Sequence, residues 1–468
     1  MGILNYLIIL CRIMNKDNLA SYEASSFCID ARKLQFEDFR DASQKVIGKV
    51  VTREDYPALI HEWWHYIQDV STSSAQNGFY LWLRDIMRIS HVISNGEDKV
   101  FHLPFPKDEF GQSISKDREL FRIFCGEDIT DNPTTAEITE RPTINLQSKR
   151  YDTNEISFAV CTVKFGDKQY PFGLIALQEL NAFYIQRIAE SYLPETHFTK
   201  PTSEFNVYPY KVGELLFEFH NINSDDKTKF IISSLCLDSI QAPAVFLTVL
   251  ERLSNKTLNY SNDRDLILNT VNEVTLDISH SNDEALNEWI KDYDLLIHSS
   301  SCTKEFRDAI QWYLSIVHDC YEAKIEYGAD ILSLLASRGK KEIGKLFETF
   351  PAPLVKYGNS IQTLGMPHSD IIGEDKIAQY DNALIIWMTR RVYDIVSCSK
   401  RNDLNKYSRC PLSDDCPYKD KVSNSYYCTQ AVWDIVQGEK KANCPFQFAL
   451  YNLGLWQNSL EIDVDSLE

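Results

Sequence analysis

The sequence predicts an α+β fold in which helices predominate, on three observations. From about residue 211 onward most of the chain carries apolar residues at helical spacing. Two earlier segments, 44–52 and 154–173, are instead rich in β-branched or alternating residues, which is typical of strands. With 468 residues, 44% of them hydrophobic, the chain can bury one large core or two ordinary ones. We expect a domain of residues 1–335 and a helical C-terminal region of residues 336–468.

The charge balance narrows the class of partner. The chain has 48 Lys and Arg residues and 67 Asp and Glu residues, which gives a formal net charge of -19. Phosphate backbones and anionic membranes would be repelled, so we expect no direct nucleic-acid or membrane partner. The apolar N-terminal segment is interrupted by Arg12 and has no preceding positive residue, so it predicts a buried strand or helix rather than an export signal. A cytoplasmic protein is the expectation.

In chain order, residues 44–52 predict a strand, and a helix should begin near Asp55 with Pro57 in its first turn, where a missing N–H costs nothing. The polar run TSSAQNG, which closes at Gly78, should end that helix, and a second helix should cover residues 79–93. Residues 104–150 are polar and contain four prolines, so they predict an irregular surface loop inserted in the domain.

Residues 154–173 predict a β-hairpin, because side-chain character alternates around a Gly166-Asp167 turn. A helix should follow over residues 173–193 and end before Pro194. Further helices are expected at 228–253, 285–298 and 303–338, and we see no internal repeat.

The candidate site lies in the first predicted helix, in the motif HEWWH. His61 and His65 are one helical turn apart, so both imidazoles can reach one ion at about 2.0–2.1 Å. Glu62 comes beside such an ion rather than onto it, where its carboxylate can take a proton from a water. The pattern predicts a zinc site with Glu62 as the catalytic base.

The motif resembles the active-site helix of the zincin metallopeptidases, which implies a zincin-like catalytic core and zinc-assisted hydrolysis of a carbonyl by a water that Glu62 deprotonates. The metzincin branch is excluded, because Gln68 and Ser71 stand where its Gly and third His would be. The gluzincin branch takes its third ligand from a glutamate on a later helix, and Glu179 in ALQELNAFYIQR is the best candidate. Gluzincins often place an aspartate four residues later, but Phe183 stands there. Asp69 is therefore a candidate to orient a histidine instead.

Other assignments stay open. Rival third ligands occur in two helical segments, GELLFEFH and HDCYEAKIEYGAD, and are Glu214, Glu218, His220, Glu322 and Glu326. A donor that stabilises the oxyanion of the reaction could be one of four residues, namely Tyr184, His220, His318 and Tyr327.

The cysteines suggest a second candidate metal site. Seven of the twelve are isolated in apolar contexts, such as Cys161, and there act as small hydrophobes. Cys410, Cys416, Cys428 and Cys444 instead crowd near the C-terminal end. Four thiolates can hold a structural zinc ion or an iron–sulfur cluster, but the spacing lacks a CxxC pair. Ordinary buried thiols or a regulatory disulfide remain alternatives.

Together these features predict a cytoplasmic zinc endopeptidase of gluzincin type that cuts a protein substrate and is restrained by narrow specificity or by a regulatory protein partner. Two rivals stay open. One is a non-catalytic helical interaction or regulatory protein with a structural metal site, which a closed four-ligand site would support. The other is a zinc-dependent hydrolase of a small amide, which a narrow pocket would favour.

Overall fold

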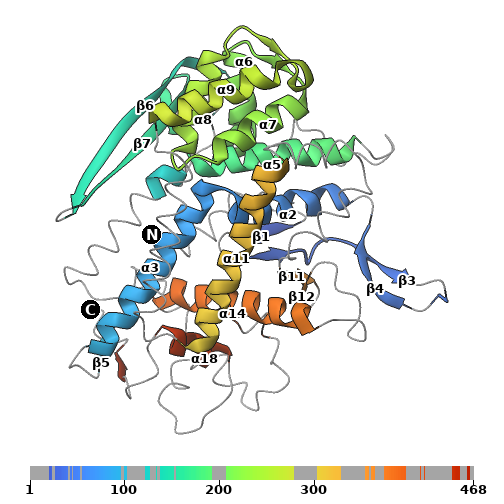
Figure 1. The fold of residues 1–468 in the computed structure, drawn as a ribbon, viewed down its shortest axis with the longest axis vertical. Helices are drawn as coiled ribbons and strands as arrows, with labels where there is room; N and C mark the ends of the chain where they lie inside the picture. Colours follow the sequence, from blue (N-terminus) through green and yellow to red (C-terminus); the bar gives the residue numbers. More distant parts are fainter. Residues whose placement is uncertain are drawn as a thin grey trace.

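The computed structural model shows a mostly helical α+β protein with several small sheets (Figure 1). It describes residues 20–23, 27–40, 43–44, 46–52, 55–95, 100–102, 122–126, 133, 137–151, 154–191, 207–278, 303–327, 354–357, 360–363, 374–396, 410, 412, 416, 445–453 and 461–463. The apolar N-terminal segment, the expected helix at 285–298 and the proposed domain boundary at 335 lie outside these ranges. Within them, no helix is both long and apolar enough to cross a membrane.

Two consecutive helices carry and support the HEWWH motif. Helix α2 (Tyr56–Ser71) begins with a proline in its first turn, as predicted, and α3 (Ser73–Asn95) follows after a single residue. The first helix ends at the TSSAQNG run, as predicted, but the second begins at Ser73 rather than at residue 79, because Thr72 caps both helices. Its amide and hydroxyl donate to Gln68 O at the end of α2, and its Oγ1 accepts from the Ala75 N–H at the start of α3.

Helix α5 (Leu174–Glu190) crosses the middle of the molecule and packs on α2 (Figure 1). On its other side lie four helices, α6 (Val212–Phe219), α7 (Asp226–Leu237), α8 (Ala242–Arg252) and α9 (Tyr260–Ile278), with a short wide turn, η3 (Val207–Lys211). The expected single helix at 228–253 is two helices, since Pro243 begins α8 after a break. Two short strands, β9 (Asn223–Ser224) and β10 (Thr257–Leu258), pair in parallel beside this group.

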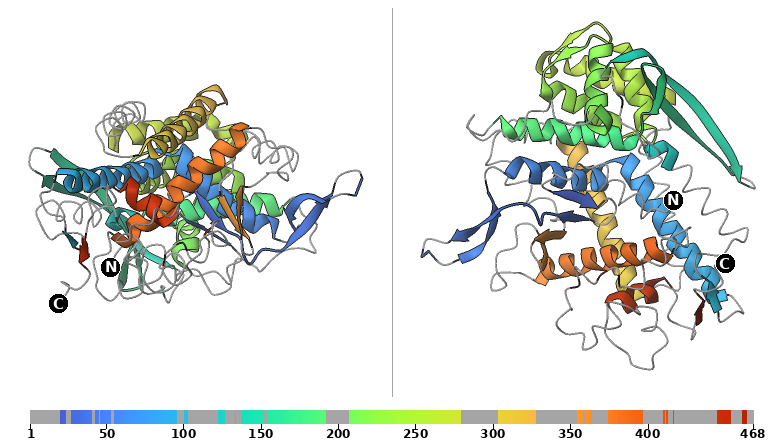
Figure 2. Two further views of the ribbon diagram at one scale, coloured as in Figure 1. Left: turned by 90° about the horizontal axis from the view of Figure 1, so that it is seen from below. Right: turned by 180° about the vertical axis from the view of Figure 1, so that it is seen from behind.

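A long two-stranded ribbon extends from the helical group, as the right-hand view in Figure 2 shows. Strand β6 (Ile138–Tyr151) pairs antiparallel with β7 (Asn154–Phe165), which also pairs with β8 (Lys168–Pro171). The hairpin around Gly166 is confirmed. The irregular loop expected at 104–150 is wrong for residues 138–150, which form β6: an edge strand tolerates Pro142, and the register shifts around it, between Glu140 and Thr143. Most of the rest of that expected loop lies outside the described residues.

A four-stranded sheet joins segments far apart in the sequence. Its order is β1 (Ser21–Glu23), β2 (Cys28–Asp30), β11 (Leu354–Tyr357) and β12 (Ser360–Thr363). Strand β11 runs parallel to β2, with Leu354 opposite Cys28. The remaining elements flank this body and are β3 (Phe36–Arg40), β4 (Val46–Val51), β5 (Val100–His102), α11 (Lys304–Tyr327), α14 (Glu374–Val396), α18 (Pro445–Asn452) and β13 (Glu461–Asp463). The strand expected at 44–52 is β4, which pairs with β3.

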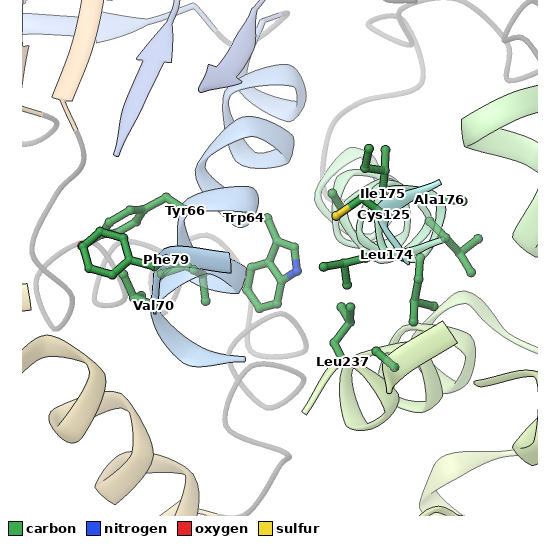
Figure 3. Packing of buried hydrophobic residues seen from close by; sticks show 14 of the residues in the cluster. Trp64, Tyr66, Val70, Phe79, Cys125, Leu174, Ile175, Ala176 and Leu237 are labelled. Atoms are coloured by element: carbon green, nitrogen blue, oxygen red, sulfur yellow. The ribbon is translucent and has the colours of Figure 1, made fainter. Parts of the chain in front are cut away.

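The buried residues form one continuous cluster across these elements. Figure 3 shows Trp64 pointing from α2 towards Leu174 of α5 and Leu237 of α7, whereas Tyr66 and Val70 point the other way, towards Phe79 of α3. Helix α2 is therefore packed on both sides, which fixes the direction in which its histidines point.

Candidate metal centre

Helices α2 and α5 bring the three predicted ligands together. The side chains of His61, His65 and Glu179 each offer one ligand atom, and these atoms lie within 4.8 Å of one another. His61 Nε2 is 3.1 Å from Glu179 Oε2 and 3.2 Å from His65 Nε2, and His65 Nε2 is 3.5 Å from Glu179 Oε2. All three side chains are almost completely buried, with exposures of 8%, 13% and 7% respectively.

The spacing of these atoms fits a tetrahedral metal ion. With bonds of about 2.0–2.1 Å, the ligand atoms of a tetrahedral zinc site lie about 3.3 Å apart. The three measured separations lie close to that value, and two imidazoles with one carboxylate are a donor set that zinc accepts. These three residues could therefore hold a metal ion and leave a fourth position.

The close approach of these groups changes their pKa values in opposite directions. Burial opposes ionisation of Glu179, but the two histidines outweigh it and hold the pKa of this carboxyl well below its usual range. Burial likewise opposes charging of His65, but Glu179 outweighs it and raises the pKa of His65 to about 9. In the metal-free protein, the carboxylate and the imidazolium thus stabilise each other.

Glu62 is buried beside the ligands. Its pKa is raised, mainly because burial disfavours the carboxylate, although His61 and His65 partly offset this and a backbone N–H of Tyr22 donates to it. Tyr22 also stacks on the His65 ring, with centroids 6.3 Å apart, and its hydroxyl donates to Asp69 Oδ2 at 2.8 Å. One residue of β1 therefore contacts three positions on one face of α2.

The group that contacts the far side of His65 is Gln68, not Asp69 as the sequence suggested. His65 Nδ1 lies 2.8 Å from Gln68 Oε1. Gln68 is three residues after His65 and so lies on the same helical face, a signal that could have identified it. His61 Nδ1 is buried and has no hydrogen-bond partner among the described residues.

The rival ligands do not join this cluster in the described part of the chain. Glu214 accepts from the Tyr184 hydroxyl and from Lys229, Glu218 is exposed, and His220 Nδ1 pairs with Ser254 Oγ at 2.9 Å. The side chains of Glu322, Glu326 and Tyr327 lie outside the description.

Of the four candidate oxyanion donors, Tyr184 is directed to Glu214 and His318 is exposed. His220 pairs with Ser254 as described above, so none of the three described candidates is shown beside Glu62. In the cysteine set, Cys410 is buried and Cys416 half-buried, whereas Cys428 and Cys444 lie outside the described residues, so this second metal site stays a prediction. The isolated Cys161 is buried in an apolar setting, as expected.

Comparisons of the chain with protein-family models, with curated proteins and with solved structures find no match.

Proposed function

We propose that the chain is a metal-dependent hydrolase. Within that class, we propose a zinc endopeptidase of gluzincin type that acts on a protein substrate in the cytoplasm. The observation that supports this most directly is the triangle of His61 Nε2, His65 Nε2 and Glu179 Oε2, with sides of 3.1, 3.2 and 3.5 Å, beside a buried glutamate that is not one of its corners.

The roles of the residues follow from their places. His61, His65 and Glu179 would hold the zinc ion, which when bound supplies a Lewis acid that polarises a carbonyl and acidifies a water. Glu62 would accept the proton of the attacking water and later deliver it to the leaving amine. The backbone N–H of Tyr22 holds the Glu62 carboxylate in place, so the base is oriented before substrate arrives.

A second candidate is a structural metal site in a non-catalytic interaction protein, and the deep burial of the three ligands favours it. The two proposals differ in the fourth position, which is open in a catalytic site and filled by protein in a structural one. In cobalt-substituted protein, a hydroxamate should change the visible absorption spectrum if that position is open. An unchanged spectrum supports the structural site.

The test of the catalytic proposal is Glu62→Gln. Glutamine keeps the volume of the side chain but cannot accept a proton at neutral pH, so activity should fall by about 10²- to 10⁴-fold while the site stays assembled. Parent and variant are incubated with a proteome, and new protein termini, zinc content and Tm are compared. Glu218→Gln, the same change at an exposed position of α6, should behave as the parent. Identical termini from parent and Glu62→Gln would contradict the role of Glu62.

We also propose that the peptidase activity is restrained, either by narrow substrate specificity or by a regulatory protein partner. A peptide-bond hydrolase produces pairs of new termini in a protein substrate, whereas a hydrolase of a small amide produces none. The terminus comparison therefore also separates these two substrate classes.

A further inference from the structure

A chain of buried polar side chains connects the core of the protein to His65. The Trp64 indole N–H donates to Asn181 Oδ1 at 2.6 Å, and Gln68 Nε2 donates to the same oxygen at 3.0 Å. Gln68 Oε1 in turn lies 2.8 Å from His65 Nδ1. Trp64, Asn181 and Gln68 are at most 2% exposed, and we call these three residues the amide relay.

The orientation of the Asn181 amide is fixed at both ends. An indole nitrogen can only donate, so the Asn181 atom that faces Trp64 must be the oxygen. A backbone carbonyl can only accept, and the other end of the amide lies 3.0 Å from Phe230 O of α7, so that end must be the nitrogen. The two constraints agree. In the opposite orientation the amide nitrogen would face the indole N–H and the amide oxygen would face the carbonyl oxygen, so neither hydrogen bond could form.

The orientation of Gln68 follows in the same way. One end of its amide lies 3.0 Å from Asn181 Oδ1 and 3.0 Å from the backbone oxygen of Gln178. Both oxygens can only accept hydrogen bonds, so the Gln68 atom that faces them must be the amide nitrogen. Its oxygen must therefore face His65 Nδ1 and accept a hydrogen bond. In the neutral imidazole, the form that binds a metal, His65 then carries its proton on Nδ1 and has the lone pair on Nε2, the atom that faces His61 and Glu179.

We propose that the amide relay selects the tautomer of His65 that binds the metal. Gln68 is the positioning residue, and the Trp64 indole N–H determines the orientation of the Asn181 amide and, through it, of the Gln68 amide. This proposal rests on the proposed zinc site. It assigns to a neutral amide the task that a carboxylate often performs beside a metal-bound histidine. It also gives a core tryptophan a role beyond packing.

The first experiment compares two substitutions at Gln68. Gln68→Met keeps the size of the side chain but removes the acceptor for His65, so zinc affinity should fall by about 10- to 100-fold. Gln68→Glu keeps that acceptor but places a carboxylate against two carbonyl oxygens, so Tm should fall while zinc affinity stays closer to the parent. A residue that only supported the fold would lose zinc affinity in step with Tm.

The matched control is Gln311→Met, the same substitution at an exposed position of α11. Metal-free proteins are titrated with zinc against a chromogenic chelator. Gln311→Met should match the parent, and equal affinities for Gln68→Met and the parent would overturn the proposal.

The second experiment reads the tautomer directly and holds even where a Gln68 variant fails to fold. Parent protein with ¹⁵N-labelled histidine is loaded with zinc, and long-range ¹H–¹⁵N spectra should show His65 with a proton on Nδ1 and coordination through Nε2. Coordination through Nδ1, or a bare Nδ1, would overturn the relay but leave the zinc site standing. Failure of the parent to bind zinc through His65 at all would instead reject the proposed function.

Discussion

At the scale of single residues, two glutamates of the site have pKa values that their surroundings shift in opposite directions. Both Glu62 and Glu179 are buried, which by itself favours the neutral acid. Glu179 lies in direct contact with two imidazoles, and their attraction lowers its pKa. For Glu62 burial prevails, and its pKa is raised. One carboxylate therefore stays charged, as a metal ligand must, while the other is suited to exchange a proton.

The raised pKa of His65 predicts how metal binding depends on pH. Below about pH 9 the metal-free imidazole carries an extra proton, which a metal must displace, whereas Glu179 is already ionised. Zinc affinity should thus rise with pH, by about tenfold per pH unit between pH 6.5 and 8.5, with one proton released per zinc. Calorimetry in buffers of different ionisation enthalpy measures this number.

The control for the proton count is His318→Gln, which changes an exposed histidine and should leave the count unchanged. Zinc binding without proton release at pH 7 would contradict the pairing of His65 with Glu179.

The local pattern of the sequence revealed some of these residues and hid others. His61, Glu62 and His65 are visible because one helical turn places them together, and Glu179 because it is a glutamate on a later amphipathic helix. Tyr22 and Asn181 could not be found this way, because their contacts with α2 cross between elements that the sequence does not place side by side.

At the scale of elements, α5 is positioned by two glycines that allow close approach. A Cβ on Gly173, at the start of α5, would lie 2.3 Å from the backbone of Cys125. A Cβ on Gly213 of α6 would lie 2.3 Å from the side chain of Leu180, which is next to Glu179. Both contacts constrain where α5, and with it the proposed third ligand Glu179, stands relative to its neighbours.

These contacts predict two different responses to alanine. Gly213→Ala should reduce the free energy of unfolding by about 1–3 kcal/mol, since the Leu180 side chain must move. Gly173→Ala should cost more, because the obstacle there is backbone, which cannot change rotamer. Denaturant unfolding of both variants gives the two values. Leu180→Ala should relieve the effect of Gly213→Ala, so that the double variant loses less than the sum of the single ones. Additive losses would contradict the contact.

The elements that the sequence mispredicted have physical explanations. Strand β6 is polar and contains Pro142, features of a loop, but an edge strand tolerates both where the register shifts. Thr72 ends one helix and starts the next, so the polar residues after it are helical rather than a connection. The hairpin around Gly166 and the helix that contains Glu179 were predictable, because their signals are local.

At the scale of the whole molecule, a bound metal would connect α2 to α5, and through α5 to the helical group of residues 207–278. Ions that bind only the folded state stabilise it by mass action. The site should therefore contribute to the stability of the whole chain.

We expect zinc to raise Tm in a concentration-dependent way, with a gain of about 2.7 kcal/mol when free zinc exceeds Kd by 100-fold. Glu179→Ala leaves only two protein ligands and should lose most of this gain. Glu218→Ala, at an exposed position of α6, should keep it. Thermal unfolding with buffered zinc measures the effect. The same zinc dependence in parent and Glu179→Ala would show that the stabilising ion binds elsewhere.

The sheet that holds Tyr22 against the motif helix also sets an order of events during synthesis. Among the described strands, β1 pairs only with β2, and β2 receives its other neighbour, β11, from residues 354–357. At about 5–20 residues per second, a ribosome adds that strand on the order of tens of seconds after β2. Until then the motif helix lacks the completed sheet behind Tyr22. A nascent chain would therefore emerge with its candidate site unfinished, and the activity proposed above would begin only after residues 354–357 have been synthesised.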